Sequence, residues 1–472
     1  MTGARDSRSR ARLAIFVAVA LLAGAHVAWQ GWLVAASPYP AVYDYDEGVY
    51  SETARAAAAG AGLYSEIFLS QPPLLIGALS RAFIMFGPTL ATARGVIVAF
   101  SVIWLVSLGA VATTGGCRRA AIWAIAAALS APAFAAASHT VQMEAPAEAL
   151  AALAVALSLT AARRTGTTGA ADALWAAAGA AAGLAIMTKI TAFTCLVPLV
   201  AAGGGRRPRT LAVLASGIAA AAAAAAVWTG AAPGGMWRDA AAFHIAVARA
   251  MPFDPGRAAQ VLRAFAAENW LLATLGLGGL AAVLRRPGVV PGRVAAAWLL
   301  ADLATVLAAH PLWPHHLVIL ISPLALLSAA GVETLAARGR LPSAALVVLW
   351  AAAVAAGCVA LRPAVSTALA DAAADVRAAI PPGDELVADD PMVAFLGGRP
   401  VPPALCDTSE ARAESGWLTE SMLRAALGDR RVRGVVLWRG TFRRLFPAVA
   451  GEAAKDFPRR WTTRGGGVIL SR

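Results

Sequence analysis

Long apolar runs separated by short polar stretches dominate the first 361 residues of the chain. A helix needs about 20 predominantly apolar residues to cross a bilayer. By this measure the chain predicts eleven spans, at 13–36, 89–113, 119–138, 142–162, 172–187, 188–203, 210–230, 269–285, 293–309, 315–333 and 342–361. The two runs that flank Lys189 are short, so the count is about eleven. The pattern predicts an all-α polytopic membrane bundle over residues 1–361.

Two outer connections are predicted to have structure of their own, and the first is too long for a simple hairpin. The connection 37–88 contains two helix-like stretches, at 47–60 and 73–86, and the second is apolar but too short to span. We expect both to be helices that lie at the membrane interface. The connection 231–268 mixes both charges and, together with the start of the next span, offers Trp237, Phe243 and Trp270 to the headgroup boundary, so it is predicted to be another interfacial piece.

From residue 362 onward the pattern changes, because charged residues become frequent and turn residues recur at 381–383, 397–398, 402–403 and 465–467. Short apolar runs at 385–388 and 432–438 are typical of strands, and helical stretches separate them. Residues 362–472 are therefore predicted to form a small α/β domain outside the membrane.

Composition agrees with the membrane prediction. The chain is 59% hydrophobic and only 14% charged, whereas an ordinary soluble domain carries roughly 25% charged residues. The net charge of +13 would suit a nucleic-acid binder, but the arginines gather in short connections between spans, so no nucleic-acid partner is expected. The four cysteines show no paired spacing, and neither a disulfide nor a zinc site is predicted.

The positions of the arginines predict the orientation. Cytoplasmic connections carry an excess of Lys and Arg. Sixteen arginines fall at every second connection, namely Arg5, Arg8, Arg10, Arg12, Arg118, Arg119, Arg163, Arg164, Arg206, Arg207, Arg209, Arg285, Arg286, Arg293, Arg338 and Arg340. We therefore expect a plasma-membrane protein with a cytoplasmic N-terminus. Segments 37–88, 138–142, 231–268 and 309–316, and the C-terminal domain, are then extracytoplasmic.

The first outer segment is rich in carboxylates. Asp44, Asp46, Glu47 and Glu52 fall within ten residues. One interpretation is structural, because Asp44 or Asp46 could cap a helix that begins near Glu47. The other is functional, because a partly desolvated carboxylate beside cations can take a proton from an acceptor hydroxyl.

Other polar residues in apolar surroundings also have two interpretations. Lys189 and Arg94 lie near outer helix ends, where each could neutralise a lipid phosphate or a carboxylate of the outer loop, or simply snorkel to the interface. His315 and His316 are adjacent and lack an obvious third metal ligand, so a phosphate contact or an interface-anchored turn is favoured over zinc. Gln71 precedes Pro72 and Pro73, which could serve only to set the angle of the following helix.

These residues resemble a known family. An Asp46–Glu47 pair after the first span, then Tyr50, Glu52 and Ala54–Arg55, and then Pro72–Leu74, resembles the C-type glycosyltransferase superfamily (GT-C). Similarity is greatest to aminoarabinose transferases and to the dolichyl-phosphate-mannose–protein mannosyltransferases. Segments 87–94, 183–189 and 316–327 also fit this resemblance, which covers most of the membrane region.

The resemblance implies a polyprenyl-phosphate-linked sugar donor, an extracytoplasmic reaction and inversion at the anomeric carbon. It makes Asp46 the catalytic aspartate, Glu47 its acidic neighbour, and Glu144 the second outer acid. Gln71 departs from the pattern, since aminoarabinose transferases carry a lysine there that contacts the donor phosphate. Members differ in whether they use a divalent cation, so a cation is left open and no metal ligands are assigned.

The candidate site follows from both lines of argument. Its catalytic residues are Asp46, Glu47 and Glu144. Its residues for the donor phosphate are Lys189, Arg94, His315 and His316, and its further donor or acceptor contacts are Asp44, Gln71 and Tyr50.

The predicted function is transfer of a sugar to a cell-envelope acceptor, which could be a lipid, a glycan or a protein. One alternative is a polytopic transporter or lipid flippase, which would be expected to carry polar groups through the depth of the bilayer and broken helices at its midplane. Another is a non-catalytic envelope-assembly protein.

Overall fold

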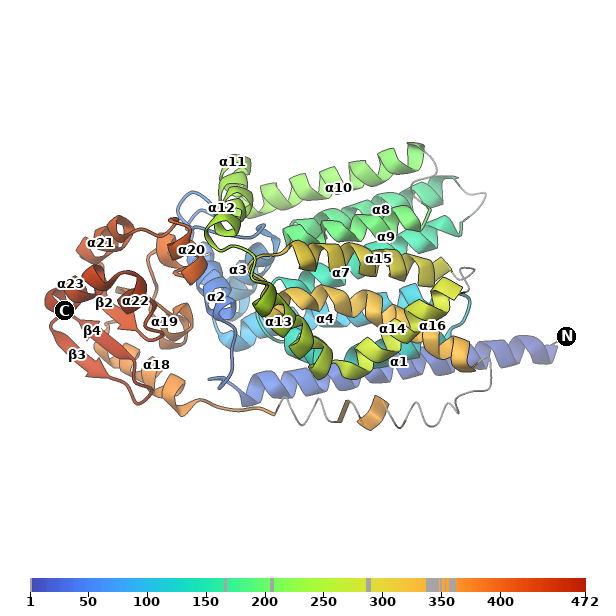
Figure 1. Ribbon diagram of the computed structural model, residues 1–472, viewed down its shortest axis with the longest axis horizontal. Coiled ribbons are helices and arrows are strands. Elements are labelled where there is room, and N and C mark those ends of the chain that lie inside the picture. Colours follow the sequence, from blue (N-terminus) through green and yellow to red (C-terminus); the bar gives the residue numbers. More distant parts are fainter. Residues whose placement is uncertain are drawn as a thin grey trace.

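The computed structural model describes residues 2–164, 168–203, 208–285, 290–336, 348, 350–352, 354–355 and 362–472. A bundle of helices precedes residue 362, and a small α/β unit, here called the C-terminal unit, comprises residues 362–472. The N-terminus and the C-terminal unit lie at opposite ends of the molecule, and α2 (Tyr45–Ala58) and α3 (Leu74–Phe86) lie where the unit meets the bundle (Figure 1).

The bundle is built from long apolar helices joined by short ones. Its elements are α1 (Thr2–Ala36), α4 (Leu90–Thr113), α5 (Arg119–Leu129), α6 (Pro132–Ala137), α7 (Glu144–Ala162), α8 (Thr168–Ile186), η1 (Ile190–Cys195), α9 (Leu196–Ala201), α10 (Pro208–Thr229), α14 (Trp270–Arg285), α15 (Val290–Ala308), η4 (Pro314–Leu320) and α16 (Ile321–Ala336). Within the described residues, seven helices are long and apolar enough to cross a membrane.

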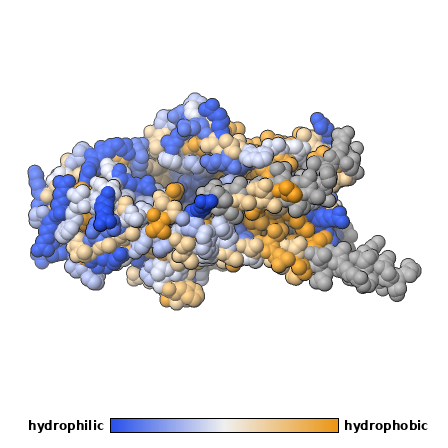
Figure 2. All heavy atoms as spheres, turned by 90° about the horizontal axis from the view of Figure 1, so that it is seen from below, coloured by the Kyte–Doolittle hydropathy of each residue, from blue (hydrophilic) through white to orange (hydrophobic). Residues whose placement is uncertain are grey.

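An eighth span results if the bent pair α13 (Pro255–Glu268) and α14, which meet at 94°, is one span. Two predicted spans, 119–138 and 188–203, are each divided between shorter helices. The predicted span 342–361 lies largely outside the described residues. The count of about eleven therefore stays a prediction, while the helical membrane character agrees with the apolar surface over the bundle and the polar surface over the C-terminal unit (Figure 2).

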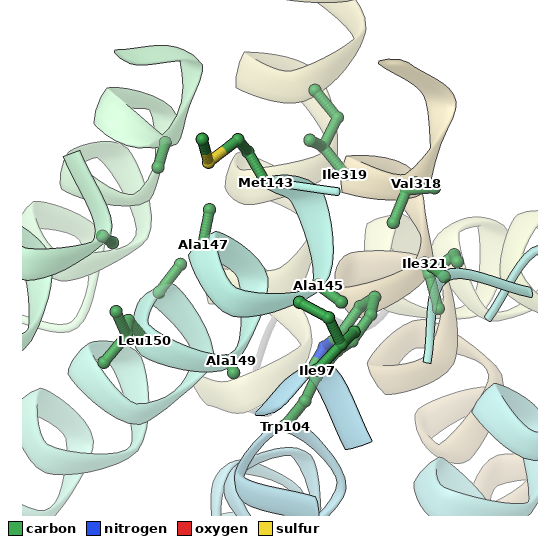
Figure 3. Packing of buried hydrophobic residues seen from close by; sticks show 14 of the residues in the cluster. Ile97, Trp104, Met143, Ala145, Ala147, Ala149, Leu150, Val318, Ile319 and Ile321 are labelled. Carbon is green, nitrogen blue, oxygen red and sulfur yellow. The ribbon is translucent and has the colours of Figure 1, made fainter. Parts of the chain in front are cut away.

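Helix α7 forms the centre of the bundle core. Its many alanines are small, so α8, α4 and η4 approach it closely, and side chains such as Ile97, Trp104 and Ile321 gather beside Ala145 (Figure 3). Trp104 is fully buried, and its indole N–H donates to Ser322 Oγ at 2.8 Å. A buried Trp N–H needs such a partner, which here ties α4 to α16.

Short helices cover the end of the bundle that faces the C-terminal unit. The predicted helices 47–60 and 73–86 are present as α2 and α3. Segment 231–268 folds as α11 (Pro233–Trp237), the π-helical turn η3 (Arg238–Ala242), α12 (Phe243–Ala250) and α13. Trp237 and Trp270 are exposed as expected, but Phe243 is buried against Phe68. The expectation for Phe243 was wrong, because its partner comes from a distant loop.

The C-terminal unit contains a four-stranded sheet of order β1-β2-β4-β3. The predicted strands are β1 (Glu385–Ala388) and β2 (Val432–Leu437), which pair in parallel. The strands β3 (Arg459–Thr462) and β4 (Val468–Ser471) form a hairpin that adds antiparallel pairs. The helical elements are α18 (Thr367–Ala379), α19 (Pro391–Gly397), η5 (Pro403–Leu405), α20 (Glu410–Glu414), α21 (Glu420–Gly428), α22 (Thr441–Leu445) and α23 (Pro447–Asp456).

Two glycines allow α14 and α16 to touch through their backbones. A Cβ atom added at Gly331 would lie 2.9 Å from the Cα of Gly279, and one added at Gly279 would overlap the carbonyl of Leu327. The neighbouring Gly278 has nothing within 4 Å of such an atom. Close backbone approach through small residues is a common way to pack helices in membranes.

We predict that Gly279→Ala lowers the free energy of unfolding by about 1–3 kcal/mol, because the added methyl forces two packed backbones apart. Gly278→Ala brings the same gain in helix propensity without a clash, so it is the matched control. The measurement is the thermal unfolding midpoint of each purified variant in one detergent. Equal midpoints for the two variants would contradict the packing argument.

Candidate functional site

The segments predicted to lie outside meet at the end of the bundle that carries the C-terminal unit. Glu47 accepts a hydrogen bond from the backbone N–H of Val141 at 3.1 Å. His315 Nδ1 donates to Asp44 Oδ2 at 3.4 Å. His244 Nε2 donates to the carbonyl of Ser70 at 2.8 Å. Segments 37–88, 138–142, 231–268 and 309–316 therefore share one site, although which side of the membrane it faces stays a prediction.

Asp44 and Asp46 lie at the start of α2. Asp44 is the N-cap residue, and its Oδ1 accepts the backbone N–H of Asp46 at 2.9 Å. One oxygen of Asp44 therefore caps the helix, as the structural interpretation predicts. Its other oxygen contacts His315. Asp46 is half-buried and receives one long contact, from Tyr50 Oη at 3.5 Å. The helix start therefore presents two carboxylates that are not fully used by the backbone.

Glu47 and Arg94 form a buried ion pair. Arg94 Nε and Nη2 each donate to a different carboxylate oxygen of Glu47 at 2.8 Å. The side chains of Arg94 and Glu47 are only 4% and 0% exposed. This two-bond geometry is the strongest form of an Arg–carboxylate contact. The structure thus pairs a predicted phosphate ligand with a predicted catalytic acid and joins α2 to α4.

Glu144 and Lys189 form a second buried pair. Lys189 Nζ donates to Glu144 Oε1, and His315 Nε2 lies 3.9 Å from the same oxygen. Lys189 lies just before η1, in the turn after α8, while Glu144 opens α7. An ammonium has three N–H donors, so Lys189 keeps hydrogen-bonding capacity beyond its carboxylate partner.

The acids at the start of α2 have unequal pKa values. Burial opposes ionisation of Asp44, but the hydrogen bond and electrostatic attraction of His315, together with hydrogen bonds from the N–H of Asp46 and from Gln142, outweigh it, so the pKa of Asp44 lies below the ordinary value. Burial raises the pKa of Asp46 to about 7. His315 acts against that increase, whereas the negative charges of Asp44, Asp407 and Glu144 add to it. Two neighbouring carboxyl groups with separated pKa values are typical of functional sites.

Three of these groups could also hold a metal ion. The donor atoms of Asp44, Asp46 and His315 all lie within 4.8 Å of one another. Carboxylate oxygens with one imidazole nitrogen suit a divalent cation such as Mn²⁺ or Zn²⁺. The sequence did not assign this set, because Asp44 and His315 are 271 residues apart.

Gln71 lies beside a histidine that the sequence analysis missed. Gln71 Nε2 is 3.5 Å from His244 Nε2, and Gln71 Oε1 is buried without a hydrogen-bond partner among the described residues. Burial lowers the pKa of His244 and the charge of Lys189 lowers it further, while the hydrogen bond to Ser70 opposes both. No local pattern marks His244, because its contacts come from a loop 174 residues away.

The Pro-Pro element places Gln71 near Lys189. The backbone N–H of Leu74 donates to the carbonyl of Met187 at 3.0 Å, so the start of α3 is docked on the turn that carries Lys189. Tyr64, at a positive φ of 64°, donates from its hydroxyl to the carbonyl of Gln71 at 2.7 Å. The two prolines thus set the angle at which α3 begins, as the structural interpretation predicts. They also bring Gln71 to the site.

His316 and Tyr50 complete the predicted set. The His316 ring lies 4.7 Å from that of His315, and His316 Nδ1 accepts the backbone N–H of Trp313 at 3.4 Å. Tyr50 is buried and points its hydroxyl at Asp46. All ten predicted residues therefore lie at the same end of the bundle, although Glu47 and Arg94 bind each other.

Two further acids lie deeper in the bundle. Glu148 Oε2 accepts a hydrogen bond from Ser322 Oγ. Asp302 is fully buried, and neither of its carboxylate oxygens has a hydrogen-bond partner among the described residues. The remaining ionisable groups named above gather at the end of the bundle rather than through its depth.

Comparison with known proteins supplies structural neighbours. No family model matches the sequence, and no curated protein matches it. ArnT from Cupriavidus metallidurans bound to undecaprenyl phosphate has a TM-score of 0.68 at 15% identity, over 96% of this chain and 97% of that one. The same protein in the apo state has a TM-score of 0.69 at 16% identity, over 98% of both chains.

A second neighbour is the archaeal oligosaccharyltransferase AglB from Archaeoglobus fulgidus, in complex with an inhibitory peptide and a dolichol-phosphate. Its TM-score is 0.57 at 14% identity, over 89% of this chain and 69% of that one. Both neighbours are membrane glycosyltransferases of one fold class. The chain described here has that fold, the GT-C fold.

Proposed function

We propose that this protein is a membrane glycosyltransferase that moves a sugar from a polyprenyl-phosphate-linked donor to a cell-envelope acceptor on the extracytoplasmic face. The observation that carries the proposal is the pair Asp44 and Asp46 beside His315, next to Lys189, at the polar end of a GT-C fold. The neighbour ArnT binds undecaprenyl phosphate and the neighbour AglB binds a dolichol-phosphate, which supports the class of donor.

Charge pairing decides which acids are free to act. Glu47 is neutralised by Arg94, and Glu144 by Lys189. Among the described residues Asp46 has no such cation, and its pKa is about 7. A general base works best when its pKa lies near the operating pH. We therefore assign Asp46 as the base that takes the proton of the acceptor hydroxyl, and Glu47 with Arg94 as the framework that holds α2.

The departing lipid phosphate needs nearby positive charge and N–H groups rather than an acid that protonates it. A lipid phosphate leaves as a stable anion, so groups that stabilise its oxygens lower the barrier. We assign this role to Lys189, with His316, His244 and Gln71 as neutral hydrogen-bonding neighbours. The sugar develops positive charge as the phosphate departs, and Asp44 and Asp46 would stabilise that charge. Attack from the side opposite the phosphate inverts the anomeric carbon.

A divalent cation fits this arrangement. Asp44, Asp46 and His315 are the residues that would hold it, and when bound it would polarise an oxygen of the donor phosphate. Asp44 is ordered by its helix-capping bond from the N–H of Asp46, which uses its other carboxylate oxygen.

The test of the proposed function is incubation of purified protein with a panel of labelled undecaprenyl-phosphate sugars and envelope fractions. The expected result is release of undecaprenyl phosphate together with transfer of label to an acceptor. Transport of the intact donor across a vesicle membrane without release would instead support the flippase alternative.

We predict that Asp46→Asn lowers the rate of transfer by about 10²–10⁴-fold, the usual contribution of a general base. Glu66→Gln is the control, because Glu66 lies in the same outer segment but only accepts the N–H of Gly62. Transfer of label from the donor measures the effect. A non-catalytic assembly protein predicts the opposite outcome, with both variants behaving like the wild type in envelope assembly.

We predict a pH-dependent difference in stability between Asp46→Asn and the wild type in buffer that contains EDTA. The pKa of Asp46 is about 7 in the folded protein, above its ordinary value of 3.8. Between these values the folded state holds more protons than the unfolded state, so stability falls as pH rises. Asparagine does not titrate, so the unfolding midpoint of the variant should exceed that of the wild type increasingly from pH 5 to pH 8. A constant difference would show that Asp46 is not perturbed.

We predict that Lys189 binds the donor phosphate in addition to Glu144. Removing Lys189 alone leaves a buried charge, which costs about 3–5 kcal/mol. The double variant Lys189→Met with Glu144→Gln removes both charges, so it should fold yet bind undecaprenyl phosphate at least tenfold more weakly. The matched double variant Arg94→Met with Glu47→Gln should keep wild-type affinity. Native mass spectrometry of lipid binding measures both, and equal affinities would exclude the phosphate role.

A further inference from the structure

The acidic turn, residues 43–46, alternates tyrosine and aspartate. The backbone at Asp44 is extended, with φ −80° and ψ 144°, and successive side chains of an extended segment face opposite sides. The aspartate contacts His315 of the bundle. Tyr43 and Tyr45 instead contact the C-terminal unit. Through its contacts with the two tyrosines, the C-terminal unit can therefore set the orientation of the neighbouring aspartates.

The tyrosine contacts are specific. Tyr43 Oη donates to Asp390 Oδ2 at 2.7 Å, and Tyr45 Oη lies 3.1 Å from Thr408 Oγ1. Asp390 is fully buried, and its other oxygen accepts the backbone N–H of Met392 at the start of α19. Burial and Asp390 both raise the pKa of Tyr43, so its hydroxyl stays protonated and remains a donor.

Arg439 connects these contacts. It follows β2, and its Nε donates to Asp390 Oδ2 at 2.7 Å. Its guanidinium carbon lies 5.5 Å from the ring centroid of Tyr43 and 4.9 Å from that of Tyr45. A guanidinium within about 6 Å of an aromatic ring is attracted to its face. One side chain of the C-terminal unit thus contacts both tyrosines and the acid that one of them binds.

We propose that Arg439 is a positioning residue that holds the acidic turn, and with it Asp44 and Asp46, in the reactive geometry. The inference rests on the proposed function and goes beyond it, because it makes the C-terminal unit a part of the catalytic apparatus. Reacting groups must be held close to the productive geometry, and small displacements lower rates strongly. If Tyr43 and Tyr45 lose their contacts with Arg439, the carboxylates of Asp44 and Asp46 are free to move.

Other contacts keep the C-terminal unit docked without Arg439. A Cβ atom added at Gly48 of α2 would lie 2.5 Å from the backbone nitrogen of Met392, so α2 and α19 pack closely. Arg55 donates to the carbonyl of Arg399, and Phe83 stacks on Phe395 with ring centroids 5.8 Å apart. Substitution of Arg439 therefore tests the acidic turn rather than the attachment of the unit.

The decisive variant is Arg439→Gln, assayed for transfer from a labelled undecaprenyl-phosphate sugar. We expect kcat to fall at least tenfold while KM for the donor stays unchanged, because the donor is held from the side of Lys189. The unfolding midpoint should fall, because the substitution leaves the buried carboxylate of Asp390 without its cation. Arg439→Lys keeps the cation and should recover most of the lost rate. Arg433→Gln is the matched control, because Arg433 is an exposed arginine of β2 in the same sheet.

A second measurement does not require activity. In hydrogen exchange, Arg439→Gln should speed exchange of the peptide 41–52 and leave the peptide 74–86 unchanged. Unaltered exchange in 41–52, or a wild-type kcat, would overturn the inference. Faster exchange in a protein whose wild type transfers no sugar would instead overturn the proposed function, so the two failures are distinguishable.

Discussion

A charge that is buried away from water must be paired, and this requirement organises the end of the bundle where the site lies. Arg94 binds Glu47 and joins α4 to α2, while Lys189 binds Glu144 and joins the turn before η1 to α7. Both pairs are nearly inaccessible to water. Breaking either would leave an uncompensated charge, which fixes the relative positions of these four segments. Among the described residues, Asp44 and Asp46 have no Lys or Arg partner of this kind, which is why the proposed function assigns the chemistry to them.

The apolar packing of the bundle brings the paired residues together. Alanine-rich α7 and the glycines that face each other in α14 and α16 let the helices approach closely. In a membrane there is little hydrophobic force between helices, so close contact and interhelical hydrogen bonds such as that from Trp104 to Ser322 contribute more. The site is therefore formed on rigid helix ends, with Glu144 and Lys189 placed by elements that cannot shift independently.

The acidic turn lies between two units of different character. The bundle contributes His315 to one side of it, and the C-terminal unit contributes Asp390, Thr408 and Arg439 to the other. Negative charge from the C-terminal unit also reaches the site, because Asp407 adds to the electrostatic increase in the pKa of Asp46. A boundary between two packed units is a common place for a reaction to be shielded from water.

The sequence by itself determined many of the helices and two of the four strands, because periodicity is a local property. It predicted the helices at 47–60 and 73–86 and the strands at 385–388 and 432–438, it grouped the four outer segments, and the Asp46–Glu47 and Pro72–Leu74 motifs indicated GT-C. Only the tertiary structure decided which polar side chains bind each other. Arg94 is 47 residues from Glu47, His244 is 173 from Gln71, and Asp390 is 347 from Tyr43. Pairing over such separations depends on how helices pack, and packing arises from the whole chain rather than from any local pattern.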